Sequence, residues 1–168
     1  LTVTLNGIDI NFGDVFETYK TLKDKGVVFL REEDMVDIEP NSYRGYRSSK
    51  GILSIGDGII TDVGFGNHES SETVSWEDAR MTSIEIENPI AVSTANSDAP
   101  SLNFYGVTEK STITDIINIL GKPASIDSSY HSPSLAELNY QFFYPMIVCI
   151  TVDVINNNIY SLSVYTKG

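Results

Sequence analysis

The stretch STITDIINILGKP, residues 111–123, carries the clearest structural signal in this chain of 168 residues. Either Ser111 or Thr112 can cap the first turn of a helix through its hydroxyl, and Asp115 suits the positive end of the helix dipole. Apolar residues then recur at the spacing of one helical face, at Ile113, Ile116, Ile117 and Leu120. This pattern predicts a short amphipathic helix.

The end of this helix is marked just as clearly. Gly121 can adopt the positive φ that closes many helices, and Pro123 cannot continue one. We therefore expect a helix over 112–120 and a positive φ at Gly121.

An earlier segment, FETYKTLKDKGV at 16–27, has the same kinds of helix signal but with different residues. Asp14 is a natural cap and Gly26 a natural stop. An apolar stripe lies between them, at Val15, Phe16, Tyr19 and Leu22. We expect a second helix near 14–25.

Short alternating runs rich in Ile, Val, Tyr and Phe follow each helical segment and are typical of antiparallel strands. The Asn-Gly pair in TLNGIDI adds a hairpin signal near the start. A small, polar stretch with a proline at each end, 88–101, divides the chain. The sequence thus predicts an α+β fold of two tandem helix-then-antiparallel-strand repeats, 1–90 and 91–168. We expect them to form one sheet, with both helices on one face.

The segment GVTEKSTITDIINILGKP, 106–123, resembles the helix signature of the small outer-membrane lipoprotein A and β-lactamase-inhibitor-protein group. The inhibitor members carry a helix-plus-four-strand unit twice. The resemblance implies a secreted or cell-surface bacterial protein that uses its sheet for contacts and does not catalyse a reaction. Two features depart from the group. The inhibitors have a disulfide in each repeat whereas this chain has one cysteine, Cys149, and the first repeat has DKGV where the second has LGKP. No inhibitory residue can be carried over.

Composition excludes some partners. The formal net charge of −12 disfavours nucleic acids and anionic membrane surfaces. The apolar runs are too short to span a bilayer. The chain begins at Leu1 rather than Met, which we interpret as the start of either a processed or a truncated chain. If a leader was removed, we expect an extracellular or cell-envelope lipoprotein.

The sequence offers no catalytic motif. His68 and His131 lie among turn-forming residues, and neither is spaced with other ligands as in a metal site. We interpret both as surface-loop histidines and Cys149 as a buried small hydrophobe. Nucleophile, phosphate-loop and dinucleotide motifs in their usual strand-to-helix setting do not occur in the sequence. We expect no cofactor and no enzyme activity.

An acidic run, REEDMVDIE at 31–39, is the one candidate for cation binding. Clustered carboxylates suit hard cations such as calcium, but the run lacks the loop pattern and the glycine of a calcium site. We expect a solvated acidic loop and no tightly held metal, and we keep a small-ligand or weak cation-binding domain as the alternative function.

The strands of the second repeat suggest a contact surface. Alternation places Tyr140, Val148 and Leu162 under the helices, so their neighbours Phe143, Ile159 and Tyr165 should lie on the open face of the sheet. A mixed polar and aromatic face suits binding. Scattered exposed hydrophobic residues would explain the same pattern.

The segment YRGYRS, 43–48, contributes a possible extension of this surface, at Tyr43 and Arg47. Tyrosine and arginine are enriched in binding hot spots, although a strand with its arginines in water fits the segment too. We therefore expect a binding or interaction module whose partner is a protein or a neighbouring domain, with no metal site.

Overall fold

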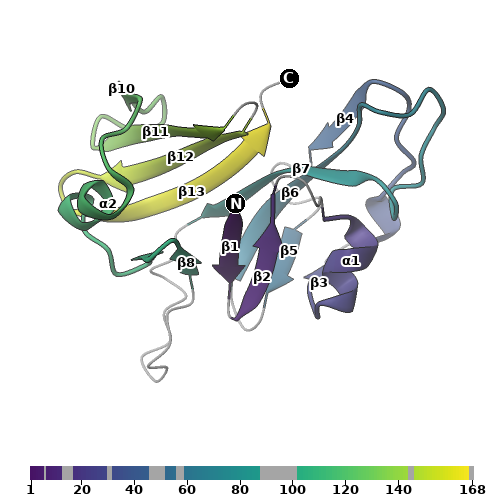
Figure 1. Cartoon of the computed structure of the whole chain (residues 1–168), viewed down its shortest axis with the longest axis horizontal. Helices are drawn as coiled ribbons and strands as arrows, with labels where there is room; N and C mark the ends of the chain where they lie inside the picture. Colours follow the sequence, from purple (N-terminus) through teal and green to yellow (C-terminus); the bar gives the residue numbers. More distant parts are fainter. Residues whose placement is uncertain are drawn as a thin grey trace.

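The computed structural model of this chain describes most of its length, and strands dominate it (Figure 1). The described residues are 1–5, 7–12, 17–29, 32–45, 52–55, 59–87, 102–143 and 146–166. Within these ranges, no helix is long and apolar enough to cross a membrane, in line with the expectation from the sequence.

The larger of two sheets has nine strands, all antiparallel to their neighbours. It runs from the C-terminal strands through β7 to the strands of the first half (Figure 1). Its order is β10 (Ser125–Ser128), β11 (Leu135–Phe143), β12 (Met146–Asp153), β13 (Asn158–Thr166), β7 (Arg80–Glu87), β6 (Ile59–Asn67), β5 (Ile52–Ile55) and β3 (Val28–Phe29), with β4 (Ser42–Gly45) also paired to β6.

The smaller sheet has four strands, in the order β2 (Ile8–Asn11), β1 (Thr2–Leu5), β8 (Leu102–Phe104) and β9 (Val107–Thr108). The Asn-Gly hairpin predicted near the start is confirmed, because Leu5 and Ile8 are directly opposite each other and Gly7 has a φ of 79°. The pairing of β1 with β8 joins the start of the chain to the segment that precedes the second helix.

Two short helices complete the fold, and they lie far apart along the molecule (Figure 1). The second, α2, spans Ile113–Leu120, and of the two predicted alternatives Thr112 is its cap; the Asp115 carboxylate accepts a 2.9 Å hydrogen bond from the Thr112 amide. Gly121 has a φ of 84°, which confirms the predicted positive value.

The first helix is shorter than the prediction of 14–25. In the structure α1 spans Tyr19–Asp24, with Thr18 as its cap. Residues 13–16, which include the expected cap Asp14 and part of the expected stripe, lie outside the described residues. A three-residue 3₁₀ helix, η1 (Glu32–Asp34), follows β3.

The predicted fold class is wrong. The chain is mostly β, with two antiparallel sheets and only two small helices, and it is not built of two helix-then-strand repeats with the helices on one face. The physical reason is that a strand hairpin precedes each helix: β1–β2 come before α1, and β8–β9 before α2. These strands pair with each other across the chain and form the second sheet.

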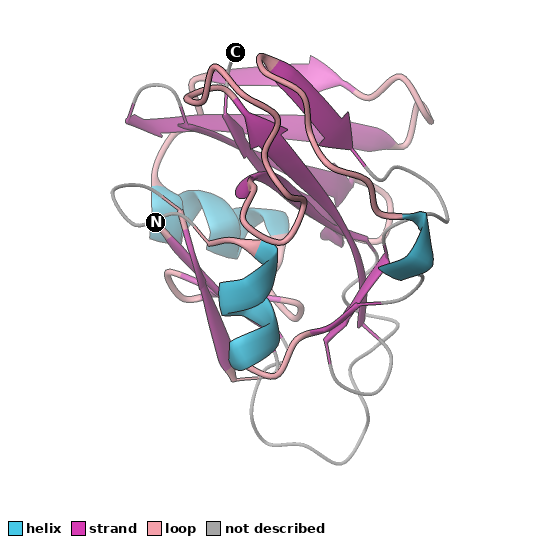
Figure 2. Cartoon of the chain, turned by 90° about the vertical axis from the view of Figure 1, so that its right-hand side faces the viewer, coloured by secondary structure: helices cyan, strands magenta, loops and turns pink. Residues whose placement is uncertain are grey.

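One hydrophobic core unites both sheets and both helices. Figure 2 shows the strands and helices that contribute to it. Buried residues such as Val3 and Phe104 come from the smaller sheet, Ile150 from the larger, and Leu22 and Ile116 from the two helices. Each of these side chains is 0% exposed, so the apolar face of the larger sheet is covered. The opposite face of β11, β12, β13 and β7 carries the intervening residues, and that face bears the candidate site.

Candidate functional site

A hollow of about 620 Å³ lies over the polar face of the larger sheet. We call it the groove. It is lined by residues of β6, β7, β13, β12 and β11, together with His68 and His131 from the loops that follow β6 and β10. Strands from both halves of the chain therefore build it, which is possible because β13 pairs with β7.

The strand register fixes the floor of the groove as two cross-strand rows. In the first row Glu137 lies opposite Thr151, Thr151 opposite Ser161, and Ser161 opposite Glu87. In the second row the sequence of partners is Asn139, Cys149, Ser163, Glu85 and Asp62. Small hydroxyl and thiol side chains thus form the centre of the floor, and carboxylates stand toward both of its sides.

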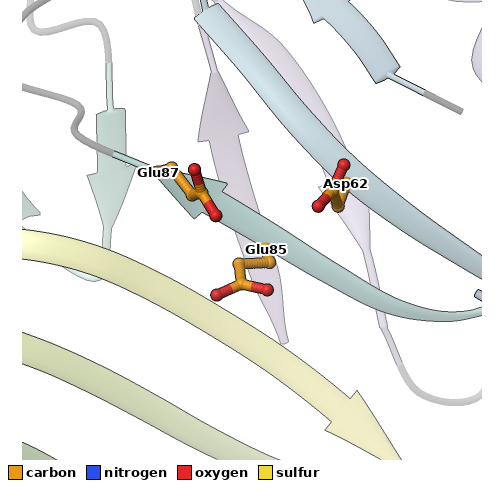
Figure 3. A group of neighbouring side chains, drawn as sticks. All are labelled: Asp62, Glu85 and Glu87. Carbon is orange, nitrogen blue, oxygen red and sulfur yellow. The ribbon is translucent and has the colours of Figure 1, made fainter. Parts of the chain in front are cut away.

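The carboxylates on one side form a close group (Figure 3). Glu85 and Glu87 alternate along β7 on one face, and Asp62 of β6 is directly opposite Glu85. Each of the three offers an oxygen within 4.8 Å of the others. A cation could be shared by three such oxygens, but hard cations usually take about six to eight oxygen ligands, and exposed acidic groups often gather in this way without an ion.

Local packing holds His68 against β6. A side chain at Gly66 would meet the Thr82 Cγ2 atom at 2.8 Å and the His68 Nε2 atom at 3.0 Å, so only glycine leaves room for both neighbours. Thr82, which is 8% exposed, also lines the groove, and its hydroxyl oxygen has no hydrogen-bond partner among the described residues. His68 and His131 are both exposed, as expected from the sequence.

Cys149 lies on the groove floor as a protonated thiol. Burial raises its pKa to about 11, and the nearby carboxylates of Glu137 and Glu85 add to the rise. Thiolate, not thiol, is the reactive nucleophile, so this cysteine is a poor nucleophile at neutral pH. Burial, together with Cys149 and Glu137, also raises the pKa of Tyr165, which therefore stays neutral as well.

The residues predicted for the contact surface do not all lie on the same face of the sheet. Tyr165 lines the groove and is 36% exposed, so its predicted place on the open face is confirmed. Phe143 is 42% exposed, but it does not line the groove. It pairs with Met146, whose side chain is buried, so it shares the face of Met146 rather than that of Tyr165. A register shift between Tyr140 and Phe143 is the cause.

The predicted exposure of Ile159 is wrong. Ile159 is 1% exposed and belongs to the hydrophobic core. Thr151 pairs with Ser161 while Val152 pairs with Ile159, so Tyr160 is an extra residue in β13. Such a bulge reverses the alternation of side chains before it. Tyr160, at 44% exposed, lines the groove instead.

The candidates from the first half remain less defined. Tyr43 lies on β4, opposite Gly66 of β6, and Arg47 lies outside the described residues. In the acidic run, Glu32 accepts a 3.1 Å hydrogen bond from Lys23. None of the described residues of this run belongs to a cluster of potential metal ligands.

Sequence reasoning missed Asp62, Glu85 and Glu87. A signal for two of them was available, because in SIEIEN the glutamates alternate with the buried Ile84 and Ile86. Strict alternation of this kind predicts carboxylates on the polar face of a strand. Their meeting with Asp62 and Glu137 depends on strand pairing that the sequence does not reveal.

No family model, curated protein or solved structure matches this chain.

Proposed function

We propose that this chain is a non-catalytic binding module that receives a partner protein, or a neighbouring domain, in the groove. The observation that carries the proposal is the hollow itself: about 620 Å³ over a sheet face where small neutral side chains form the centre of the floor and carboxylates lie toward its sides. The opposite face of the larger sheet carries apolar residues that are buried in the core. The face with the groove is therefore the one that is free for recognition.

The chemistry of the groove favours binding over catalysis. The only thiol has a raised pKa of about 11. Among the described residues, neither the His68 nor the His131 side chain forms a hydrogen bond or an ion pair with a carboxylate, which is the arrangement that general-base catalysis uses. Tyrosines at the margin, Tyr160 and Tyr165, are residues of the type that anchors protein interfaces. The extracellular or cell-envelope location, and the kinship with the inhibitor group, are part of this proposal.

The test is to fill the groove. Ser163 lies at the centre of the floor, so a Ser163→Trp substitution should occupy much of the space that a partner would enter. Ser128→Trp is the matched control, because Ser128 is exposed on the same sheet and opposite Ala136, on the other face. Both variants should be checked for an unchanged far-ultraviolet circular dichroism spectrum and thermal midpoint.

A partner captured from the native cell envelope is then purified and titrated against all three proteins. We expect wild type and Ser128→Trp to bind equally, and Ser163→Trp to bind at least about tenfold more weakly, a change of about 1.4 kcal/mol. Equal affinity of Ser163→Trp and wild type for that partner would remove the groove from consideration.

A further inference from the structure

The charged side chains that the structure describes in the groove are mostly acidic. Among the described residues, its lining includes the carboxylates of Asp62, Glu85, Glu87 and Glu137 and no lysine or arginine. The nearest neighbour along the first row adds another acid, because Asp127 of β10 lies opposite Glu137. Concave surfaces lined by charges of one sign concentrate ligands of the opposite sign.

The register gives the spacing of these charges. Glu137 and Glu87 occupy the same cross-strand row and are separated by Thr151 and Ser161. Three steps between adjacent strands of about 4.8 Å each place the two positions roughly 14 Å apart. Between them lie only hydroxyls, which can donate or accept hydrogen bonds but carry no charge.

An extended polypeptide matches this spacing. Its residues rise about 3.4 Å each, so residues i and i+4 lie about 14 Å apart and project on the same side. We infer that the groove binds a basic segment of a partner protein, with one cation at Glu137 and a second, four residues along, at the Glu87 side. This inference rests on the proposed function and names the chemistry of the partner.

Charge also decides between occupants. A second copy of this chain carries the same net charge of −12, and the described lining of its own groove offers no lysine or arginine to the first. A single small cation would bind the carboxylates of one side only and would leave Glu137, at the other end of the row from Glu87, without a ligand. A basic segment engages both sides at once.

The experiment is an NMR titration of isotopically labelled protein with three short peptides. Their cores are Lys-Gly-Ser-Gly-Lys, the isomer Gly-Lys-Lys-Ser-Gly with adjacent lysines, and Glu-Gly-Ser-Gly-Glu. We expect the first peptide to shift amide signals of Thr151, Ser161 and their neighbours, the isomer to bind more weakly, and the acidic peptide not to bind. Higher sodium chloride should weaken the binding, because salt screens exposed charges.

Two double variants separate the groove from the overall charge. Glu87→Gln/Glu137→Gln removes one acid from each end of the row, and we expect about five- to tenfold weaker binding from two partly exposed charges. Glu33→Gln/Glu39→Gln changes the net charge equally at exposed positions outside the groove, and it should bind like wild type. Equal weakening in both variants, or equal binding of the two lysine peptides, would overturn the inference.

Spermidine and calcium chloride are titrated in parallel. If either shifts the same signals at lower concentrations than the Lys-Gly-Ser-Gly-Lys peptide does, the occupant is a small cation and the inference is wrong. Failure of this inference is distinguishable from failure of the proposed function. If no basic peptide binds the groove but Ser163→Trp still abolishes binding of the captured partner, the proposed function stands and the partner has a different chemistry.

Discussion

Glu17 shows how a single buried charge ties the parts of the first half together. Its carboxylate accepts hydrogen bonds from the Thr21 hydroxyl at 2.8 Å, from both the backbone and side-chain nitrogens of Asn11 at 3.2 Å, and from Lys25. Its carbonyl oxygen accepts a 2.8 Å hydrogen bond from the Met81 amide. The residue is 3% exposed, so this network links β2, α1 and β7 away from water.

The Glu17 network predicts acid sensitivity. Burial alone would raise the pKa of Glu17, but the hydrogen bonds from Lys25, Thr21 and Asn11 outweigh it and lower the pKa below its ordinary value of 4.5. A lowered pKa contributes stability that is present above the unfolded value and is lost as the pH falls through the folded value. The Glu17→Ala change should therefore cost about 1–3 kcal/mol at pH 7 and less at pH 3.

Urea unfolding at both pH values measures this. Glu33→Ala is the control, because Glu33 is exposed, and its effect should stay within about 0.5 kcal/mol. An equal loss of stability at pH 7 and pH 3 for Glu17→Ala would show that the charge of the carboxylate is not what stabilises the fold.

At the scale of elements, sequence signals within one segment predicted the ends of α2, but they did not predict how the strands pair. The cap and stop of α2 are both contained within 112–121, and the structure confirms them, whereas of the predicted stripe only Ile116 is buried and Ile117 is 36% exposed. The bulge at Tyr160 arises only from the register of β13 against β12, so no pattern within β13 could show it. This is why Tyr165 was placed correctly and Ile159, on the far side of the bulge, was not.

The bulge has a measurable consequence. An Ile159→Ala change should destabilise the protein by about 2–5 kcal/mol, because it removes a fully buried side chain and leaves a cavity. Ile155→Ala is the control, since Ile155 is 77% exposed in the preceding turn, and it should change stability by no more than about 0.5 kcal/mol. Chemical unfolding gives both values. A loss below about 1 kcal/mol for Ile159→Ala would place that side chain back on the open face.

At the scale of the whole molecule, the groove belongs to neither half alone. Its acids come from β11 in one half and from β7 and β6 in the other. The division of the chain into 1–90 and 91–168 stays a prediction, but the larger sheet crosses that boundary through ten residues of β13 and β7 in register. A groove that depends on such pairing could not be predicted from segments read one at a time.

We expect the stability of the fold not to depend on a metal ion at the acidic side of the groove. We predict the same thermal midpoint with EDTA as with millimolar calcium, because the three carboxylates of Asp62, Glu85 and Glu87 provide fewer ligands than a tight calcium site has. Differential scanning fluorimetry of wild type and Asp62→Asn tests this. A calcium-dependent rise in the wild-type midpoint that Asp62→Asn abolishes would establish a cation site, since a ligand of the native state raises its stability.

The junction of β13 with β7 also constrains how the protein can be made. Glu87 and Ser161 are paired but lie 74 residues apart in the chain (161 minus 87), so β7 leaves the ribosome long before its partner does. During that interval one edge of β7 has no partner, and an unpaired edge is a template for aggregation. Pairings between distant segments also slow folding. Nascent chains that stall before β13 should therefore be the aggregation-prone species, and chaperones should matter most for this protein until β13 has been synthesised.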